Sequence, residues 1–360
     1  MNMKDKGIDI SFIIPVYNGE VVVRRMTDSI CRLPEDISIE VIAVDDGSSD
    51  RSFIELYDIA FKDDRVKLIH TKNRGQSSAR NTGFSAARGK YVFFADADDE
   101  VIPEGILKLY KEAEKGSHDI TCGTYIRKEP GKSDFQALKG LKSGSVSRDG
   151  RGKKLFGHIK TKSAFGYVWN KLYKKAFLEE NGLRFDESIK VYMEDQLLNL
   201  KAFACGADWY FLNEPVYIYH FEGESTTRRA DPDIAEKSAA MLRSYDAYLK
   251  ERGAQQENQD LFTPLAMRMA AWAAFKNIAY EGADRKKIRE RLEIFSDEEG
   301  LRYMLEHEEC RAYLTELPSK LQRKLFTLTY DCLKEKKEGK LAGIFALASP
   351  MMKAASKMVR

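Results

Sequence analysis

The chain of 360 residues lacks the features that mark several large classes of protein. Its five cysteines are odd in number and form no Cys-x-x-Cys pair, which argues against a zinc knuckle or a disulfide framework and favours reduced thiols in a cytoplasmic protein. A formal net charge of +3 argues against a dedicated nucleic-acid binder. No run of about 18 uncharged apolar residues is present, so no membrane-spanning helix is expected. The polar residues 1–9 do not resemble a secretory signal.

Two common nucleotide-binding motifs are also missing. A dinucleotide-binding fold needs Gly-x-Gly-x-x-Gly after its first strand, where residues 15–20 are Pro-Val-Tyr-Asn-Gly-Glu. The Gly-x-x-x-x-Gly-Lys-Ser/Thr of a phosphate-binding loop does not occur. An EF-hand that starts at Asp96 is excluded because Val101 and Leu107 stand where its Gly and Glu belong. A nucleotide site in this chain must therefore be built differently.

The first hundred residues alternate short apolar runs, rich in β-branched residues, with longer stretches of helical spacing. The runs that we expect to be strands are Ile10–Val16, Ile39–Val44, Val66–Ile69 and Tyr91–Ala95. The stretches that we expect to be helices are Val21–Leu33, Phe53–Phe61 and Ser77–Ala87. Strands that alternate with helices predict an α/β fold with a mainly parallel sheet flanked by helices.

Polar residues follow each predicted strand. They are Tyr17–Asn18, Asp45–Ser48, Asn73–Gly75 and Asp96–Asp99. In an open parallel sheet these positions lie at one edge, the carboxyl ends of the strands, where α/β folds bind ligands. The sequence therefore predicts one site built from four separate segments.

The acidic run Asp96–Asp99 directly follows an apolar strand and precedes Pro103, which suits the start of a helix. Two carboxylates in an Asp-x-Asp motif can share a divalent cation with a diphosphate, and Mn²⁺ or Mg²⁺ prefers such oxygen ligands. A solvated acidic turn is the alternative for an isolated motif. The buried strand before this run favours a Mn²⁺ or Mg²⁺ site.

Two further segments offer groups that recognise a nucleotide. A carboxylate at Asp45 or Asp46 can accept hydrogen bonds from a base N–H or a ribose hydroxyl. Arg80 lies near the start of the helix that follows Gly75, where its guanidinium presents a fork of donors for phosphate. An arginine on the solvent face of an ordinary helix is an equally good interpretation of Arg80.

Four motifs in this order resemble the family 2 glycosyltransferases, which are inverting enzymes of the GT-A fold. They are Ile13–Asn18, Val44–Ser48, Gly75–Gly83 and Asp96–Asp99. Val168–Tyr173 and Tyr192–Gln196 extend the resemblance more loosely, to about residue 228. Within the former, Trp169 is expected in the core, with stacking on an acceptor sugar as the alternative.

The resemblance implies a role for each matching residue. Asp98 would ligate Mn²⁺ or Mg²⁺, with His220 as an additional ligand; a lone histidine after a strand is otherwise structural. Asp195 would be the general base that takes the proton of the acceptor hydroxyl; an acid at a helix start is otherwise a cap. The donor-binding residues would be Pro15, Tyr17, Asn18, Asp45, Asp46, Arg80 and Asp96.

The remaining sequence predicts a second region. The pattern beyond about Asp231 is helical, so we expect a GT-A-like catalytic domain over residues 1–228 and an α-helical C-terminal region over 229–360. Residues 127–162 are rich in Gly, Ser and Lys without periodicity and are expected to form a long basic loop. Residues 334–360 have the pattern of a basic amphipathic helix, interrupted by Pro350, which would dock on the core or lie on an anionic membrane.

The function that the resemblance implies is transfer of a hexosyl or N-acetylhexosaminyl group from a nucleotide-sugar, most simply a UDP-sugar, to an acceptor hydroxyl. A carbohydrate or lipid-linked acceptor in polysaccharide or glycolipid assembly for the cell envelope fits this reaction. The expected location is the cytoplasm or the inner face of the membrane. Two alternatives stay open: a metal-dependent phosphoryl or nucleotidyl transferase that uses Asp96 and Asp98, and a non-catalytic nucleotide-sugar-binding module.

Overall fold

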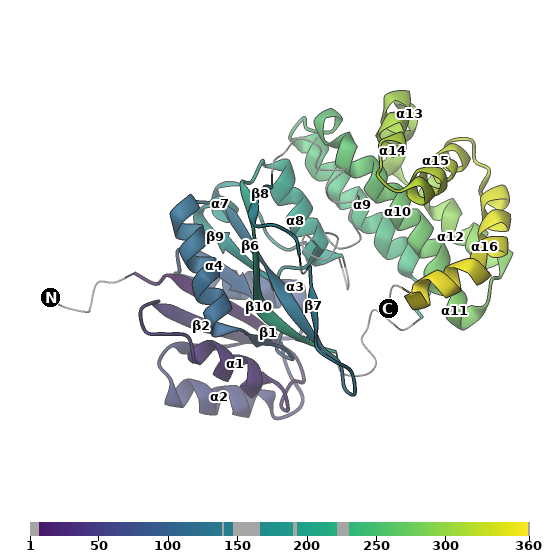
Figure 1. Cartoon of the computed structure of the whole chain (residues 1–360). Coiled ribbons are helices and arrows are strands. Elements are labelled where there is room, and N and C mark those ends of the chain that lie inside the picture. Colours follow the sequence, from purple (N-terminus) through teal and green to yellow (C-terminus); the bar gives the residue numbers. More distant parts are fainter. Residues whose placement is uncertain (1–6, 139, 147–165, 190–192, 222–229, 359–360) are drawn as a thin grey trace. The chain divides into compact units, whose positions relative to one another are not determined.

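The computed structural model of the chain describes residues 7–138, 140–146, 166–189, 193–221 and 230–358, which belong to two compact units (Figure 1). The described residues up to 221 belong to the first unit, and those from 230 onward belong to the second. The predicted domain boundary between residues 228 and 229 lies outside the described residues.

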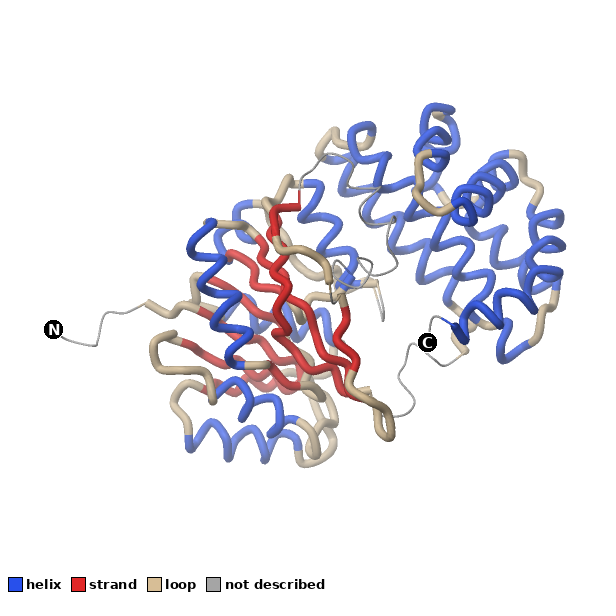
Figure 2. Tube along the Cα trace, viewed as in Figure 1, coloured by secondary structure: helices blue, strands red, loops and turns tan. Residues whose placement is uncertain are grey.

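A mixed β-sheet forms the centre of the first unit (Figure 2). Its strands lie in the order β3-β2-β1-β4-β9-β6-β10-β5, with β7 beside β6 and β8 beside β10. The longest pairings are parallel, those of β1 with β2, of β2 with β3 and of β6 with β10, whereas β9 runs antiparallel between β4 and β6. The strands are β1 (Ile10–Val16), β2 (Ile39–Asp45), β3 (Val66–His70), β4 (Tyr91–Phe94), β5 (Glu100–Val101), β6 (Ile120–Lys128), β7 (Phe135–Ala137), β8 (Gly144–Val146), β9 (Lys171–Lys174) and β10 (Trp209–His220).

Helices cover both faces of this sheet, with α4 in front of it and α3 behind it in the view of Figures 1 and 2. Strands β1, β2 and β4 are buried along their whole length, as expected for parallel strands covered on both faces. The predicted α/β fold with a mostly parallel sheet is therefore confirmed. The helices of this unit are α1 (Val23–Cys31), α2 (Ser52–Lys62), α3 (Gln76–Ala86), α4 (Pro103–Gly116), α7 (Lys175–Glu180) and α8 (Glu194–Ala204).

Helix α3 packs very closely on the sheet because it carries Gly83 at the contact. A Cβ atom at Gly83 would lie 2.5 Å from Cγ2 of Ile13, a separation that side chains do not reach without a shift. The close approach brings the first turns of α3, with Arg80, beside Asp96, which follows β4. Sheet and helix together thus determine the position of Arg80.

The basic segment 127–162 is more regular than its composition suggests. Its first part contains β7 and β8, which pair antiparallel with β6 and β10. The expectation of a loop is therefore wrong for these residues. Hydrogen bonds to neighbouring strands hold them in a strand conformation that no periodic pattern in the sequence indicates. Residues 147–162 lie outside the described part of the chain.

The second unit consists of helices, which confirms the predicted α-helical C-terminal region. Helix α10 supplies a large share of its core, with most of its side chains buried. The helices are α9 (Ile234–Glu251), α10 (Gln259–Lys276), α11 (Ile278–Glu281), α12 (Arg285–Ser296), α13 (Arg302–Glu306), α14 (Ala312–Thr315), α15 (Lys320–Lys334) and α16 (Glu338–Met358), with short 3₁₀ turns between some of them.

Helix α16 packs into this unit through part of its apolar face. Leu341 and Phe345 are buried, and the Phe345 ring lies 4.5 Å from that of Phe275 on α10. The expected interruption at Pro350 is wrong: the helix runs through it, although proline contributes no backbone N–H there. In the described residues, no helix has the length and apolar character needed to cross a bilayer.

Candidate active site

The loops that follow β1 and β2 are joined by hydrogen bonds. The backbone N–H of Asn18 donates to Oγ of Ser48 at 3.0 Å, and the side-chain oxygen of Asn18 accepts from the N–H of Ser49 at 2.8 Å. Pro15 lies buried inside β1, whereas 55% of Tyr17 is exposed. The predicted nucleobase side of the site thus has one exposed aromatic ring beside a well-ordered pair of loops.

Asp45 and Asp46 are both buried and both accept hydrogen bonds from their surroundings. Asp45 Oδ2 lies 2.6 Å from Nδ1 of the exposed His70. Asp46 accepts the backbone N–H groups of Arg74 at 3.0 Å and Gly75 at 2.7 Å, which fixes the loop before α3. Their predicted contacts with a donor nucleotide stay predictions; in this structure Asp46 organises a loop.

The acidic run after β4 separates its carboxylates by environment. Asp96 is half-buried, Asp98 is exposed, and Asp99 is buried with its Oδ1 accepting the backbone N–H of His220 at 2.8 Å. Burial raises the pKa of Asp99 well above its usual range, and the neighbouring Asp98 and Asp96 add to that rise. Asp99, to which the sequence gives no chemistry, therefore ties the turn to β10.

Of the two predicted metal ligands, Asp98 is exposed and His220 lies against a carboxylate. Nε2 of His220 lies 2.6 Å from a carboxylate oxygen of Glu100, so ligation of a metal through Nε2 would require that contact to break. Among the described residues, no group of three or more His, Cys, Asp or Glu side chains is arranged to hold a metal ion. The exposed Asp98 fits an ion that is held mainly by a donor diphosphate, and its role and that of His220 stay predictions.

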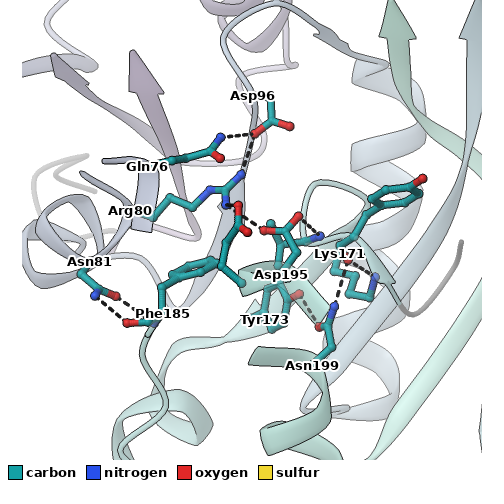
Figure 3. A network of polar contacts seen from close by, with 12 residues as sticks. Gln76, Arg80, Asn81, Asp96, Lys171, Tyr173, Phe185, Asp195 and Asn199 are labelled. Atoms are coloured by element: carbon teal, nitrogen blue, oxygen red, sulfur yellow. Dashed lines mark hydrogen bonds and ion pairs between the residues drawn. The ribbon is translucent and has the colours of Figure 1, made fainter. Parts of the chain in front are cut away.

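Arg80 joins two parts of the site that are far apart in sequence (Figure 3). Its Nη2 donates to Asp96 and its Nη1 to Asp195, each at 2.7 Å, while Glu194 lies 3.7 Å away. Only 1% of the Arg80 side chain is exposed. Burial on its own would lower the pKa of Arg80, but the carboxylates outweigh this effect and raise it.

Asp195 lies in the first turn of α8 with 15% of its side chain exposed. Its second oxygen accepts the backbone N–H of Val168 at 3.3 Å. Burial raises the pKa of Asp195 to about 7, an effect that Glu194 and Asp96 reinforce and Arg80 opposes. A carboxylate with a pKa near neutrality and partial access to solvent has the properties of a general base.

A second group of polar side chains, which includes Lys171, Tyr173 and Asn199, lies near Asp195 (Figure 3). Lys171 is buried and donates to the side-chain oxygen of Asn170 at 2.8 Å and to the backbone oxygen of Tyr167. Burial lowers the pKa of Lys171 to about 8. Asn199 links the backbone oxygen of Tyr167 to the hydroxyl of Tyr173, with bonds of 3.1 Å and 2.8 Å. These contacts stabilise the strand that precedes the base.

Trp169 lies in the core, with only 3% of its surface exposed. Its ring stacks on Tyr167 at 4.5 Å and on Tyr217 at 4.7 Å. The alternative of stacking on an acceptor sugar is therefore not open to Trp169. Tyr167, which is 39% exposed, is the aromatic residue of this stack that reaches solvent.

Sequence reasoning placed Asp96, Arg80 and Asp195 in one site, and the structure brings these three together. The sequence alone gave no role to Glu194, Gln76 or Asn81. In the structure Gln76 donates to Asp96 at 3.2 Å, and Asn81 donates to the backbone oxygen of Phe185 at 2.9 Å. The Glu-Asp pair at the start of α8 and the Arg-Asn pair in α3 can be recognised in the sequence. Their contact with each other cannot, because Arg80 and Asp195 are 115 positions apart.

The α/β fold places carboxylates at the ends of its strands, where such folds bind ligands, and three comparisons with known proteins show the class to which it belongs. The model of the family described as "Glycosyl transferase family 2" matches residues 11–182. The uncharacterized glycosyltransferase EpsJ of Bacillus subtilis (strain 168) is 35% identical over 246 residues, which cover 66% of this chain and 70% of EpsJ. The chain belongs to glycosyltransferase family 2.

Two further similarities extend this result. The succinoglycan biosynthesis protein ExoO of Rhizobium meliloti (strain 1021) is 29% identical over 268 residues, which cover 68% of this chain and 69% of ExoO. The crystal structure of S. aureus TarS 1–349 in complex with UDP-GlcNAc superimposes with a TM-score of 0.66 at 18% identity, and the match covers 92% of this chain and 91% of TarS 1–349. At that identity the likeness shows the fold.

Proposed function

We propose that this glycosyltransferase moves a sugar with inversion from a UDP-sugar to an acceptor hydroxyl, and that it works in polysaccharide or glycolipid assembly. The single observation that carries the proposal is Asp195, a partly exposed carboxylate with a pKa near 7 that shares Arg80 with Asp96. The name of ExoO, a succinoglycan biosynthesis protein, supports polysaccharide assembly, and the complex of TarS 1–349 with UDP-GlcNAc supports a UDP-sugar donor.

In this reaction Asp195 accepts the proton of the acceptor hydroxyl while that oxygen attacks the anomeric carbon of the donor. The new carbon–oxygen bond forms as the bond to the diphosphate breaks, and the diphosphate leaves with the electron pair. One displacement inverts the anomeric centre, so no covalent enzyme intermediate is needed. A base with a pKa near the working pH suits such a proton transfer.

The donor would lie along the loops that follow β1, β2 and β4. Tyr17 and Asp45 would contact the nucleobase, Asp96 the ribose, and Asp98 a Mn²⁺ or Mg²⁺ ion that the diphosphate also holds. When bound, such an ion offsets the negative charge that develops on the leaving diphosphate. The exposure of Asp98 and the order of the Asn18–Ser48 loops support this arrangement.

The test combines binding with turnover. UDP, UDP-glucose, UDP-galactose and UDP-GlcNAc are titrated into the protein with and without Mn²⁺ by calorimetry, and UDP release from the sugars is measured. We expect Mn²⁺-dependent binding of UDP, slow UDP release with water as the acceptor, and a loss of release by roughly 10²–10⁴-fold in Asp195→Asn at unchanged UDP affinity, the contribution typical of a general base.

Asp63→Asn is the matched control, because Asp63 lies before β3, away from the carboxyl ends of the strands, and its carboxylate pairs with Arg65 at 2.6 Å. It should leave release unchanged. Absence of UDP binding in the wild type would refute the proposal. Binding without release would favour a non-catalytic module, and hydrolysis of the nucleotide without release of sugar would favour a phosphoryl or nucleotidyl transferase.

Peripheral membrane contact through residues 334–360 is part of the proposal, with a cytoplasmic location at the inner membrane face. The face of α16 with Leu341 and Phe345 is buried, so contact would use residues such as Leu347, which is 84% exposed. Sedimentation with vesicles of anionic lipid tests this: Leu347→Glu should reduce binding, and Leu321→Glu, at another exposed leucine, should not. Equal sedimentation of all three proteins would contradict membrane contact through α16.

A further inference from the structure

The guanidinium of Arg80 already has two partners, although the sequence suggests a phosphate role for it. Its two terminal nitrogens each lie 2.7 Å from a carboxylate, one from Asp96 and one from Asp195, and the side chain is 1% exposed. A diphosphate could reach these nitrogens only by displacing one of the carboxylates. The contacts of Arg80 therefore point to a role other than phosphate binding.

We propose that Arg80 is a positioning residue that acts through Asp195, orienting the base and keeping it ionised, and that it does not bind the donor diphosphate. This inference rests on the proposed function, because it takes Asp195 to be the base. The planar fork of a guanidinium fixes the direction of a carboxylate as well as its charge, which a lysine does not.

Phe185 and Asn81 help to hold Arg80 in place. The ring of Phe185 lies 5.1 Å from its guanidinium carbon. Asn81, the next residue in α3, donates to the backbone oxygen of Phe185 at 2.9 Å and accepts its N–H at 3.0 Å. With Val168 N–H on the other oxygen of Asp195, the carboxylate is bonded on both sides by groups whose own positions are fixed.

The charges around Asp195 explain why this contact affects ionisation. The groups that act on it are Arg80, Glu194, Asp96, Lys171, Tyr167 and Tyr173. Burial and the two neighbouring carboxylates favour the protonated form of Asp195, and the guanidinium opposes them. Loss of Arg80 therefore shifts Asp195 toward the protonated form, which cannot accept a proton.

The experiment follows the carboxyl carbon of Asp195 by NMR in the full chain labelled with [4-¹³C]aspartate, with the signal assigned from Asp195→Asn. The variants are Arg80→Met and, as the matched control, Arg88→Met, whose side chain is 65% exposed and pairs with Glu40. We expect the titration midpoint of Asp195 to rise by one pH unit or more in Arg80→Met and to stay unchanged in Arg88→Met. The affinity for UDP relative to that for uridine, measured by calorimetry with Mn²⁺, should stay within about twofold in both, because Arg80 also bonds Asp96, the proposed ribose contact, and only a lost diphosphate contact would change this ratio.

An unchanged midpoint in Arg80→Met would overturn the inference, and so would a tenfold fall in the affinity for UDP relative to that for uridine. Arg80→Lys covers the case in which Arg80→Met does not fold, because it keeps the charge without the fork. Its UDP affinity should be unchanged while UDP release falls by roughly 10²-fold, the size of effect that a small misplacement of a catalytic group produces; full activity would overturn the positioning role. Failure of the proposed function is seen separately, as a wild type that binds no UDP, and the midpoints still decide whether Arg80 sets the ionisation of Asp195.

Discussion

The two acidic parts of this site are built on different principles. In the loop after β2, Asp46 is bonded by neutral backbone N–H groups of Arg74 and Gly75. In the cluster around α8, Asp96, Glu194 and Asp195 surround one guanidinium, so that three negative charges face a single positive charge on Arg80. Backbone N–H groups carry a constant partial charge at a defined position, whereas a shared guanidinium links the ionisation of every carboxylate near it.

This difference separates structural from chemical carboxylates. The bonds from Arg74 and Gly75 to Asp46 stabilise the loop before α3. Burial raises the pKa of Asp195 to about 7, with Arg80 opposing this rise and Glu194 and Asp96 adding to it. We therefore expect Asp46 to contribute to loop stability and Asp195 to carry the proposed proton transfer, and substitutions on the two sides test this comparison.

The largest effect on stability is expected for Asp46→Asn. The amide offers one acceptor oxygen where the carboxylate offers two, so a backbone N–H, of Arg74 or Gly75, loses its partner. A lost buried hydrogen bond costs about 1–3 kcal/mol, and urea unfolding measures it. The pH dependence of UDP release should stay that of the wild type; a shifted profile would mean that Asp46 belongs to the chemical group.

A smaller effect, on pH dependence, is expected for Glu194→Gln. UDP release by the wild type should rise with pH through about 7, because Asp195 accepts a proton only when ionised and its pKa is about 7. The charge of Glu194 raises that pKa, so its removal lowers the pKa and moves the acidic limb of the rate profile to lower pH. Movement to higher pH, or no movement, would contradict the shared-cation account. Glu180→Gln, at an exposed position at the end of α7, is the control.

Much of the fold could be predicted from the sequence because it depends on local patterns. The runs of β-branched residues gave the first four strands within one residue at each end, and the polar residues after them do meet, as the bonds of Asn18 with Ser48 and of Arg80 with Asp96 show. The spacing of apolar residues and the presence of turn residues are properties of short segments, and the structures that they predict are found in the folded chain.

The parts that could not be predicted depend on distant partners. Nothing near Arg80 in sequence indicates that it meets Asp195, and nothing in Asp45–Asp46 shows that Asp46 bonds the loop before α3. Strands β7 and β8 have no alternating pattern and owe their form to neighbouring strands. The predicted donor and metal contacts stay predictions, because they depend on the shape and charge of molecules other than the chain.

The adjacent residues Arg80 and Asn81 also have a consequence for how this protein could be redesigned. Asn81 holds the backbone at Phe185, and Arg80 holds Asp195, so two adjacent residues of α3 bond two positions that are ten residues apart in the sequence. A substitution that displaces this turn of α3 would therefore disturb Asp195 and the backbone at Phe185 together. A redesign of the site should accordingly keep Arg80 and Asn81 as a pair.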